Sequence, residues 1–480
     1  MGSEMCIRDS VTRHRVDPDG SQTFQQVCSI RQVTHADCGY VEGYYGRLFD
    51  WQERKAIVDV LARNNLGRYL YAPKEDIKHR YRWREPYDKA WLQQFADFCA
   101  YANQHKVSVI AGVAPGLDFD FGDLPSSADF NALLSKCQKL IEYGADDICL
   151  LMDDIDADFH KRSGSIESEG KAHALLANIL ADQLPGSFAE NTAKSNNIAN
   201  PAGRAIQVVP RIYADELSAD TTAYLPHFIE TLDNRHTVLY CGSNIVAESV
   251  CQDEIENYLK LTEQKIIVWD NLYANDYCPR RLFLGPWSGR SNAGSVLLNP
   301  TGMVHTDCLL LDIMAATIRL QVANGVARST ENASDASKPD FLKDAMALDV
   351  SEDATAPDAS ENAVAPDASK AINGSDIANS AWRTVLEAHQ VPEQFYAIAE
   401  YFCHPVFNSR QWQSIDSASQ EQLDAIEYLL WRWKTPLSRE WYPFIMSLKH
   451  DLLINAGQLP ELRIQKTQSP ALADHLLSRD

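Results

Sequence analysis

The chain has 480 residues, 45% of them hydrophobic, and a formal net charge of -22. This length exceeds the usual size of one hydrophobic core, so we expect one large domain of about 250–300 residues and a smaller unit. The acidic charge argues against a general nucleic-acid binder, which needs a basic face for phosphates, and no apolar stretch approaches the roughly 18–20 residues of a membrane span, so we expect a soluble protein.

The first ten residues, "MGSEMCIRDS", look like a translated sequencing adapter rather than a sequence that evolved to fold. We therefore expect residues 1–10 to be an artefact and the true N-terminus to be missing. Residues 11–36 form an N-terminal segment to which the sequence assigns no structure.

The 11 cysteines are scattered, with no C-x-x-C pair and no Cys/His spacing typical of a zinc site. Cys149 and Cys241 lie in apolar runs, where a cysteine is most often a small core residue. This pattern favours free thiols in a reducing compartment and therefore a cytoplasmic location. The missing N-terminus leaves the compartment open.

Eight short apolar or β-branched runs predict strands, and segments with helical periodicity lie between most of them. The predicted strands are residues 39–45, 67–73, 107–115, 147–154, 205–213, 237–243, 265–271 and 295–300. The predicted helices are residues 51–65, 88–105, 128–144, 170–184 and 222–234, with Ser127 as one N-cap. Apolar strands that alternate with helices indicate a parallel sheet. Eight units fit a closed (β/α)₈ barrel over residues 37–328 better than an open doubly wound sheet.

Two further regions and a C-terminal tail (461–480) follow the predicted barrel. Residues 329–380 repeat "APDAS" and hold 11 acidic and three basic side chains, which predicts a disordered linker rich in Ala, Asp and Ser. Residues 381–460 are aromatic with helical periodicity and predict a small helical bundle. We expect it to pack on the barrel or on a second subunit, which would make a homodimer through these helices.

Polar side chains gather at the carboxyl ends of the predicted strands, where a (β/α)₈ barrel places its active site. The set comprises Glu42, Tyr45, Lys74, Asp76, Asp153, Asp154, Tyr213, Trp269, Asp270, Asn271, Asp276 and Asn299. Carboxylates, amides, a lysine and aromatic rings together suit a sugar, because hydroxyl groups need donors and acceptors and pyranose rings stack on aromatic faces. Asp270 is expected to serve as a turn or capping residue.

Asp153 and Asp154 end the apolar run of the fourth predicted strand. Adjacent strand residues point to opposite faces, but the chain turns into a loop here, so both carboxylates could reach the mouth of the barrel. One could stay ionised while the other acts as a general acid, the division of roles that glycosidases use. The alternatives are a solvated loop pair, or half of a Mg²⁺ site with Asp156 and Asp158.

Several motifs carry a family resemblance. They are "GYVEGYYGRLFDWQERKAIVDVLARNNLGRYLYAPKEDIKHRYRWREPY", "LLMDDID", "WDNLYANDY", "RRLFLGPWSGR" and "LLNP". Over about residues 37–325 the chain resembles family 84 of the glycoside hydrolases, the protein O-GlcNAcase and bacterial β-N-acetylglucosaminidase family. Residues 390–455 resemble, more weakly, the helical region that follows the barrel in O-GlcNAcases.

The resemblance implies a retaining, substrate-assisted mechanism in which the 2-acetamido oxygen of the sugar attacks its own anomeric carbon and forms an oxazoline, an exception to the two-carboxylate scheme. Asp153 would accept a hydrogen bond from the acetamido N–H and stabilise the oxazolinium charge. Asp154 would protonate the leaving oxygen and then activate water. The implied mechanism uses no metal and no cofactor.

The remaining site residues are also carried over from the resemblance. Those expected to hold sugar hydroxyls are Gly43 through its backbone, Lys74, Asp276 and Asn299. Asn271 would support the acetamido and acid groups, Tyr213 would bind near the acetamido oxygen, and Trp269 would form a pocket wall.

The sequence therefore predicts an exo-β-N-acetylglucosaminidase that removes O-linked N-acetylglucosamine from Ser or Thr of proteins. A second interpretation is a hexosaminidase or hyaluronidase-like enzyme that acts on free glycans or peptidoglycan fragments. A third is a non-catalytic barrel that binds N-acetylglucosamine. The expected partner is an N-acetylglucosamine-bearing protein or glycan, with no nucleic acid and no membrane.

Overall fold

The computed structural model describes residues 37–156, 159–186, 204–220, 224–250, 255, 258, 263–290, 294–331, 374–403 and 418–458. The predictions made for residues 1–36 and 461–480, and for most of 329–380, lie outside these ranges. Of the helices in the described part, none is long and apolar enough to cross a membrane.

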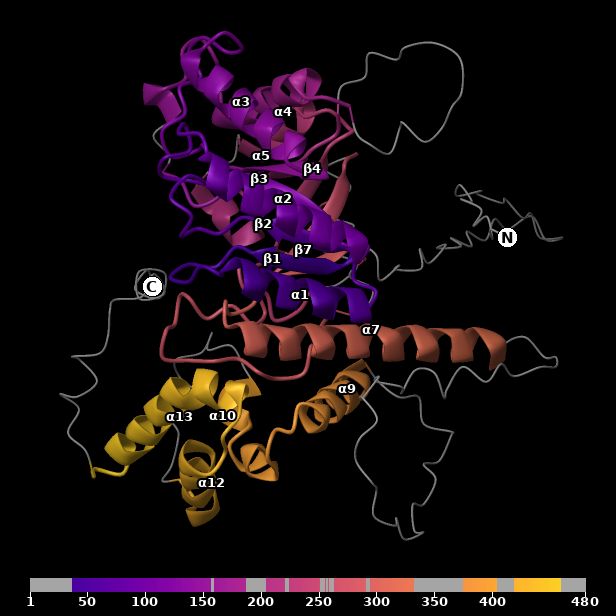
Figure 1. The fold of residues 1–480 in the computed structure, drawn as a ribbon, viewed down its shortest axis with the longest axis vertical. Helices are drawn as coiled ribbons and strands as arrows, with labels where there is room; N and C mark the ends of the chain where they lie inside the picture. The colour runs from indigo at the N-terminus through magenta and orange to yellow at the C-terminus, as the bar shows by residue number, and fades with distance from the viewer. Residues whose placement is uncertain are drawn as a thin grey trace, which may run out of the picture.

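Eight parallel strands form a closed barrel in chain order (Figure 1). They are β1 (Gly39–Glu42), β2 (Arg68–Tyr71), β3 (Ser108–Val113), β4 (Asp147–Leu151), β5 (Gln207–Val209), β6 (Thr237–Tyr240), β7 (Lys265–Asp270) and β8 (Val296–Leu298). β1 pairs with both β2 and β8, which closes the ring. The predicted (β/α)₈ architecture is confirmed.

Each predicted strand continues past the C-terminal end of the observed one. Tyr213, for example, is predicted inside a strand but lies beyond the end of β5. Most of these extra residues are buried at the mouth of the barrel, although Asp154 is exposed, so hydrophobicity alone does not mark where the hydrogen-bonded ladder stops. The polar residues at the predicted strand ends therefore belong to the loops after the strands.

Within the described residues, six α-helices of the barrel have their full bounds given. They are α1 (Trp51–Arg63), α2 (Lys89–Gln104), α3 (Ala128–Glu142), α4 (Glu169–Gln183), α5 (Tyr224–Thr231) and α7 (Val304–Glu331), with 3₁₀ turns η2 (Phe159–Lys161) and η4 (Asp215–Asp220). Ser127 caps α3 as predicted, because its side chain accepts a hydrogen bond from the amide of Phe130 at 3.1 Å. The helix α7, which follows the eighth strand, was not among the predicted helices.

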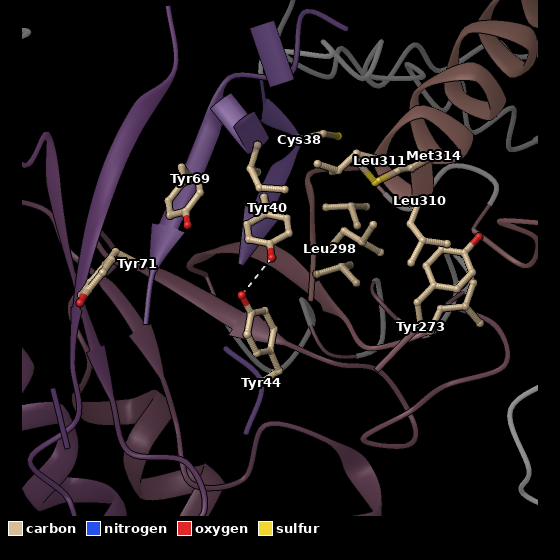
Figure 2. Close-up of a cluster of buried hydrophobic side chains, with 14 of the residues drawn as sticks. Cys38, Tyr40, Tyr44, Tyr69, Tyr71, Tyr273, Leu298, Leu310, Leu311 and Met314 are labelled. Atoms are coloured by element: carbon tan, nitrogen blue, oxygen red, sulfur yellow. Dashed lines mark hydrogen bonds between the residues drawn. The ribbon is translucent and has the colours of Figure 1, made fainter. Parts of the chain in front are cut away.

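The side chains of the strands alternate between two apolar layers. Val41, Leu70, Cys149 and Leu297 belong to the cluster inside the barrel, whereas their strand neighbours join the layer between sheet and helices. Figure 2 shows part of this outer layer, in which Tyr40, Leu298 and residues of α7 come together. Among the described cysteines all are free, and Cys149 and Cys241 are buried as predicted.

The C-terminal helices pack on the barrel of the same chain, with α7 between them and the strands (Figure 1). They are α9 (Gly374–Ala388), η5 (Glu393–Ala397), α10 (Glu400–Cys403), α12 (Gln420–Trp431) and α13 (Pro436–Asn455). Glu440 of α13 accepts hydrogen bonds from the amides of His305 and Thr306, at 3.0 and 2.7 Å, and thereby caps the start of α7.

The predicted linker boundaries need correction at both ends. α7 extends to Glu331, and α9 begins at Gly374, so the predicted segment 329–380 overlaps two helices. Ile377, Ala381 and Trp382 are buried on one face of α9, and this packing favours helix despite the acidic composition upstream.

Candidate active site

Asp153, which follows β4, forms a buried ion pair with Lys74, which follows β2. The side chains of Lys74 and Asp153 are only 2% and 7% exposed. Burial alone raises the pKa of the Asp153 carboxyl, but Lys74 and Arg80 together outweigh burial and hold this pKa below its usual value. Asp153 is therefore an ionised carboxylate at neutral pH. Its Oδ1 atom is buried and has no hydrogen-bond partner within the described residues.

Asp154 has a different environment from its neighbour. Its side chain is 30% exposed and lies 4.0 Å from the Lys74 ammonium. The hydroxyls of Tyr213 and Tyr45 donate hydrogen bonds to its two oxygens at 2.7 and 2.8 Å. Burial, and then the charge of Asp154, raise the pKa of both phenols, so both remain donors. One buried carboxylate and one accessible carboxylate thus stand side by side.

A chain of neutral hydrogen bonds forms the opposite side of the mouth. Trp269 Nε1 and Asn299 Nδ2 both donate to Asn271 Oδ1, each at 2.9 Å. The amide of Gly43 donates to Asn299 Oδ1 at 3.0 Å, and Asn271 Nδ2 donates to the carbonyl of Ile245 at 2.8 Å. The loops after β1, β6, β7 and β8 are joined through these side chains.

Gly43 has no room for a side chain. A Cβ atom at this position would lie 2.4 Å from Cζ2 of Trp269. Two residues further on, the amide of Tyr45 donates to Asp276 Oδ2 at 2.9 Å, and burial raises the pKa of the Asp276 carboxyl. The backbone of this loop therefore lies directly against both Trp269 and Asp276.

Three of the polar residues at the strand ends face away from the mouth. Glu42 is buried between β1 and α1, where Arg54 binds it with two hydrogen bonds of 2.8 and 2.9 Å. Asp76 accepts hydrogen bonds from two tyrosine hydroxyls at 2.8 and 2.6 Å. Asp270 forms a buried ion pair with Arg290 at 2.9 Å, which fits the structural role predicted for it.

Arg80 contacts the aspartate pair, but sequence reasoning missed it. It is buried, and its guanidinium donates to the backbone carbonyls of Asp153 and Asp154 at 3.2 and 2.5 Å. It lies within the loop after β2 rather than at a strand end, so the barrel rule did not select it. The only available signal was its position in the same loop as Lys74.

The metal alternative requires further acidic ligands beside the pair. Asp156 is exposed, and Asp158 lies outside the described residues. In the part of the chain that the structure describes, no group of three or more His, Cys, Asp or Glu side chains is arranged to hold a metal ion.

Comparisons with known proteins show which proteins this chain is similar to. A family model described as beta-N-acetylglucosaminidase matches residues 38–308. The protein O-GlcNAcase of Rattus norvegicus is 30% identical over 303 residues, which are 61% of this chain and 31% of the rat protein. That of Mus musculus is 29% identical over 324 residues, 65% of this chain and 33% of the mouse protein. The chain thus spans about a third of the length of these relatives.

A solved structure shares the fold. A mutant of an O-GlcNAc hydrolase from Thermobaculum terrenum superposes with a TM-score of 0.59 at 19% identity, covering 86% of this chain and 81% of that protein. At this identity the similarity supports the architecture and not the chemistry.

Proposed function

Because the chain belongs to the β-N-acetylglucosaminidase family of glycoside hydrolases, we propose that it is a retaining exo-β-N-acetylglucosaminidase with substrate-assisted catalysis. The observation that carries this proposal is the pair of unlike neighbours at the end of β4. Asp153 is buried and ionised, and its Oδ1 has no hydrogen-bond partner among the described residues, whereas Asp154 is accessible and held by two tyrosine hydroxyls.

In the first step, the acetamido oxygen of the sugar bonds to the anomeric carbon while the bond to the leaving oxygen breaks. Asp154 gives its proton to that leaving oxygen. Asp153 accepts a hydrogen bond from the acetamido N–H through Oδ1, and its negative charge stabilises the positive oxazolinium ring. A buried carboxylate with a lowered pKa suits this role, because it stays charged throughout.

In the second step, Asp154 removes a proton from a water molecule that attacks the anomeric carbon, and the ring opens to restore the acetamido group. Two inversions at one carbon give net retention. The accessible position of Asp154 suits a group that must meet both the leaving oxygen and water.

The other residues of the mouth would hold the sugar. Lys74, Gly43, Asp276 and Asn299 would bind hydroxyls, and in the structure each of these already pairs with a neighbouring polar group. The sugar hydroxyls would exchange with, or add to, these pairs. Trp269 would form a wall of the pocket.

Asn271 and Tyr213 would act around the acetamido group. Asn271 would support the acetamido and acid groups from its place between Trp269 and Asn299. Tyr213 would bind near the acetamido oxygen, and its bond to Asp154 links it to the acid as well.

We further propose that the natural substrate is O-linked N-acetylglucosamine on proteins, since two relatives bear the name protein O-GlcNAcase. The purified protein should hydrolyse an aryl β-N-acetylglucosaminide and a glycosylated peptide faster than chitobiose. Preference for chitobiose would favour the free-glycan alternative. A wild-type protein that binds the sugar without turnover would favour a binding barrel.

The mechanism has its own test. Stepwise fluorination of the substrate acetamido group weakens its oxygen as a nucleophile, so kcat/KM should fall steeply across the series. A flat response would overturn substrate assistance while leaving the glycosidase assignment in place.

A further inference from the structure

Asp153 and Asp154 are neighbours in the chain, yet both carboxylates lie at the mouth of the barrel. Successive side chains of an extended strand point to opposite faces of the sheet. The Lys74 ammonium nevertheless reaches both Asp153 and Asp154, so both carboxylates lie on the same side. The regular strand ends at Leu151, and the backbone after it must turn.

The turn is made by an unusual backbone conformation. Asp154 has a φ of 52°, which lies in the left-handed region that residues with a side chain rarely adopt. Such a conformation persists only where the surrounding structure enforces it, and it is concentrated at functional sites.

Arg80 is placed to supply that enforcement. One guanidinium donates from Nη1 to the carbonyl of Asp153 and from Nη2 to the carbonyl of Asp154. These two carbonyls lie on either side of the Cα atom of Asp154, the residue in the left-handed conformation. The fork of an arginine spans two acceptors in fixed geometry, which a single ammonium group cannot do.

The loop that carries Arg80 is itself anchored to the barrel. The neighbouring His79 is fully buried, its ring Nδ1 lies 2.9 Å from the carbonyl of Gly112 in β3, and its own carbonyl accepts from the amide of Ala114 at 3.0 Å. Burial lowers the pKa of His79 to about 3, so this anchor stays neutral across the working range. Arg80 therefore projects from a fixed point.

We propose that Arg80 is a positioning residue: it holds the backbone of the aspartate pair in the left-handed turn that brings both carboxylates to one mouth. Its expected effect on turnover rests on the proposed function. Its effect on the geometry of the turn does not.

The test compares Arg80→Met, Arg80→Lys and Arg80→Ala with a control, Arg82→Met. Arg82 lies two residues away in the same loop, is 55% exposed and pairs only with the neighbouring Glu85 among the described residues. On an aryl β-N-acetylglucosaminide, Arg80→Met should lose about 100-fold in kcat with little change in KM, the scale expected for about 1 Å of misplacement. Arg80→Lys should recover only part of the loss, and Arg82→Met should match the wild type.

Two readouts separate positioning from loss of folding. Added ethylguanidinium should restore part of the kcat of Arg80→Ala, while wild type and Arg82→Met should not respond. A crystal structure of Arg80→Met should show Asp154 out of the left-handed region and its carboxylate away from Tyr213. Unchanged backbone at Asp154, or a kcat equal to that of the wild type, would overturn the proposal. If the wild type itself has no turnover, the proposed function fails, and the crystal structure still decides the role of Arg80.

Discussion

The two sides of the barrel mouth are held by different forces. The side formed by the loops after β2 and β4 depends on charge, with Lys74, Arg80 and two carboxylates in contact. The side formed by the loops after β1, β7 and β8 depends on neutral amide and indole hydrogen bonds. Charges in a buried setting are sensitive to pH and to loss of one partner, whereas the neutral side should respond mainly to changes in shape.

The neutral side also has support from outside the barrel. Arg280 and Arg281, in the loop after β7, form ion pairs of 2.5 and 3.2 Å with Asp451 of α13. The indole of Trp382 in α9 donates to the carbonyl of Leu284 at 2.5 Å. The loop that bears Asp276 is thus held from behind by the C-terminal helices, so we expect this smaller region to influence the shape of the mouth.

The largest effect should come from the charged side. Asp154→Asn should lower kcat/KM by about 10³-fold on a substrate with a poor leaving group, because proton transfer from a placed acid contributes roughly 10²–10⁴-fold. The loss should be much smaller with a dinitrophenyl leaving group, which departs without a proton. Asp153→Asn should lose activity on both substrates alike. Equal behaviour of the two variants across leaving groups would contradict the division of roles.

On the neutral side, Gly43→Ala should lose activity for steric reasons. The new methyl group would meet Trp269, so we expect kcat/KM to fall by about 100-fold, as for a misplacement near 1 Å. The double variant Gly43→Ala with Trp269→Phe should be more active than Gly43→Ala alone if the clash is the cause. Steady-state kinetics of Gly43→Ala, Trp269→Phe and the double variant, measured beside the wild type, complete this double-mutant cycle.

Lys74→Met should change how the stability of the protein depends on pH. In the wild type the folded-state pKa of Asp153 is lowered, so its stabilisation is present above the unfolded pKa of about 4 and is lost as pH falls through the folded value. Without Lys74, burial is opposed only by more distant charge and the pKa of Asp153 should rise. The variant should then lose stability relative to the wild type as pH increases above about 4. At pH 7 its unfolding free energy should be roughly 3 kcal/mol lower, the lower end of the range for breaking a buried ion pair.

Thermal or urea unfolding at pH 4.5 and pH 7 measures this effect. Lys171→Met is the matched control, because Lys171 of α4 forms an exposed ion pair with Glu167, which lies just before the helix. It should change the unfolding free energy by less than about 0.5 kcal/mol at either pH. A Lys74→Met penalty that does not grow with pH would contradict the assignment of a buried ionised Asp153.

The smallest effect should come from the C-terminal support. Asp451→Asn should raise KM by about threefold and lower the unfolding free energy by about 1.5–3 kcal/mol, the range for hydrogen bonds to charged groups. Glu427→Gln removes a more exposed ion pair between α12 and α13 and should leave KM unchanged. If both variants behave alike, the helices contribute stability without shaping the mouth.

The sequence was most informative where one rule applies to every strand. Residues at the ends of apolar runs meet at one mouth of a parallel barrel, so Asp153, Lys74 and Asn299 could be brought together without coordinates. Which of two neighbours faces the mouth could not be predicted, since it depends on where the ladder stops. Glu42 faces α1 while the adjacent Gly43 faces Asn299.

Contacts made through the backbone were beyond prediction. Arg80 acts on two carbonyl groups, which every residue possesses, so the sequence contains no pattern that pairs it with Asp153 and Asp154. The left-handed turn at Asp154 depends on such tertiary contacts. The support of the loop after β7 by Asp451 likewise joins residues that are far apart in the chain.

The capping of α7 by Glu440 has a consequence for how the chain is made. Thr306 and its cap are separated by 134 residues, and a ribosome adds about 5–20 residues per second. The first amides of α7 therefore lack this acceptor for on the order of 10 s after they are synthesised. The last helix of the barrel is therefore uncapped when it is made, and it can acquire this partner only after a further 134 residues have been synthesised.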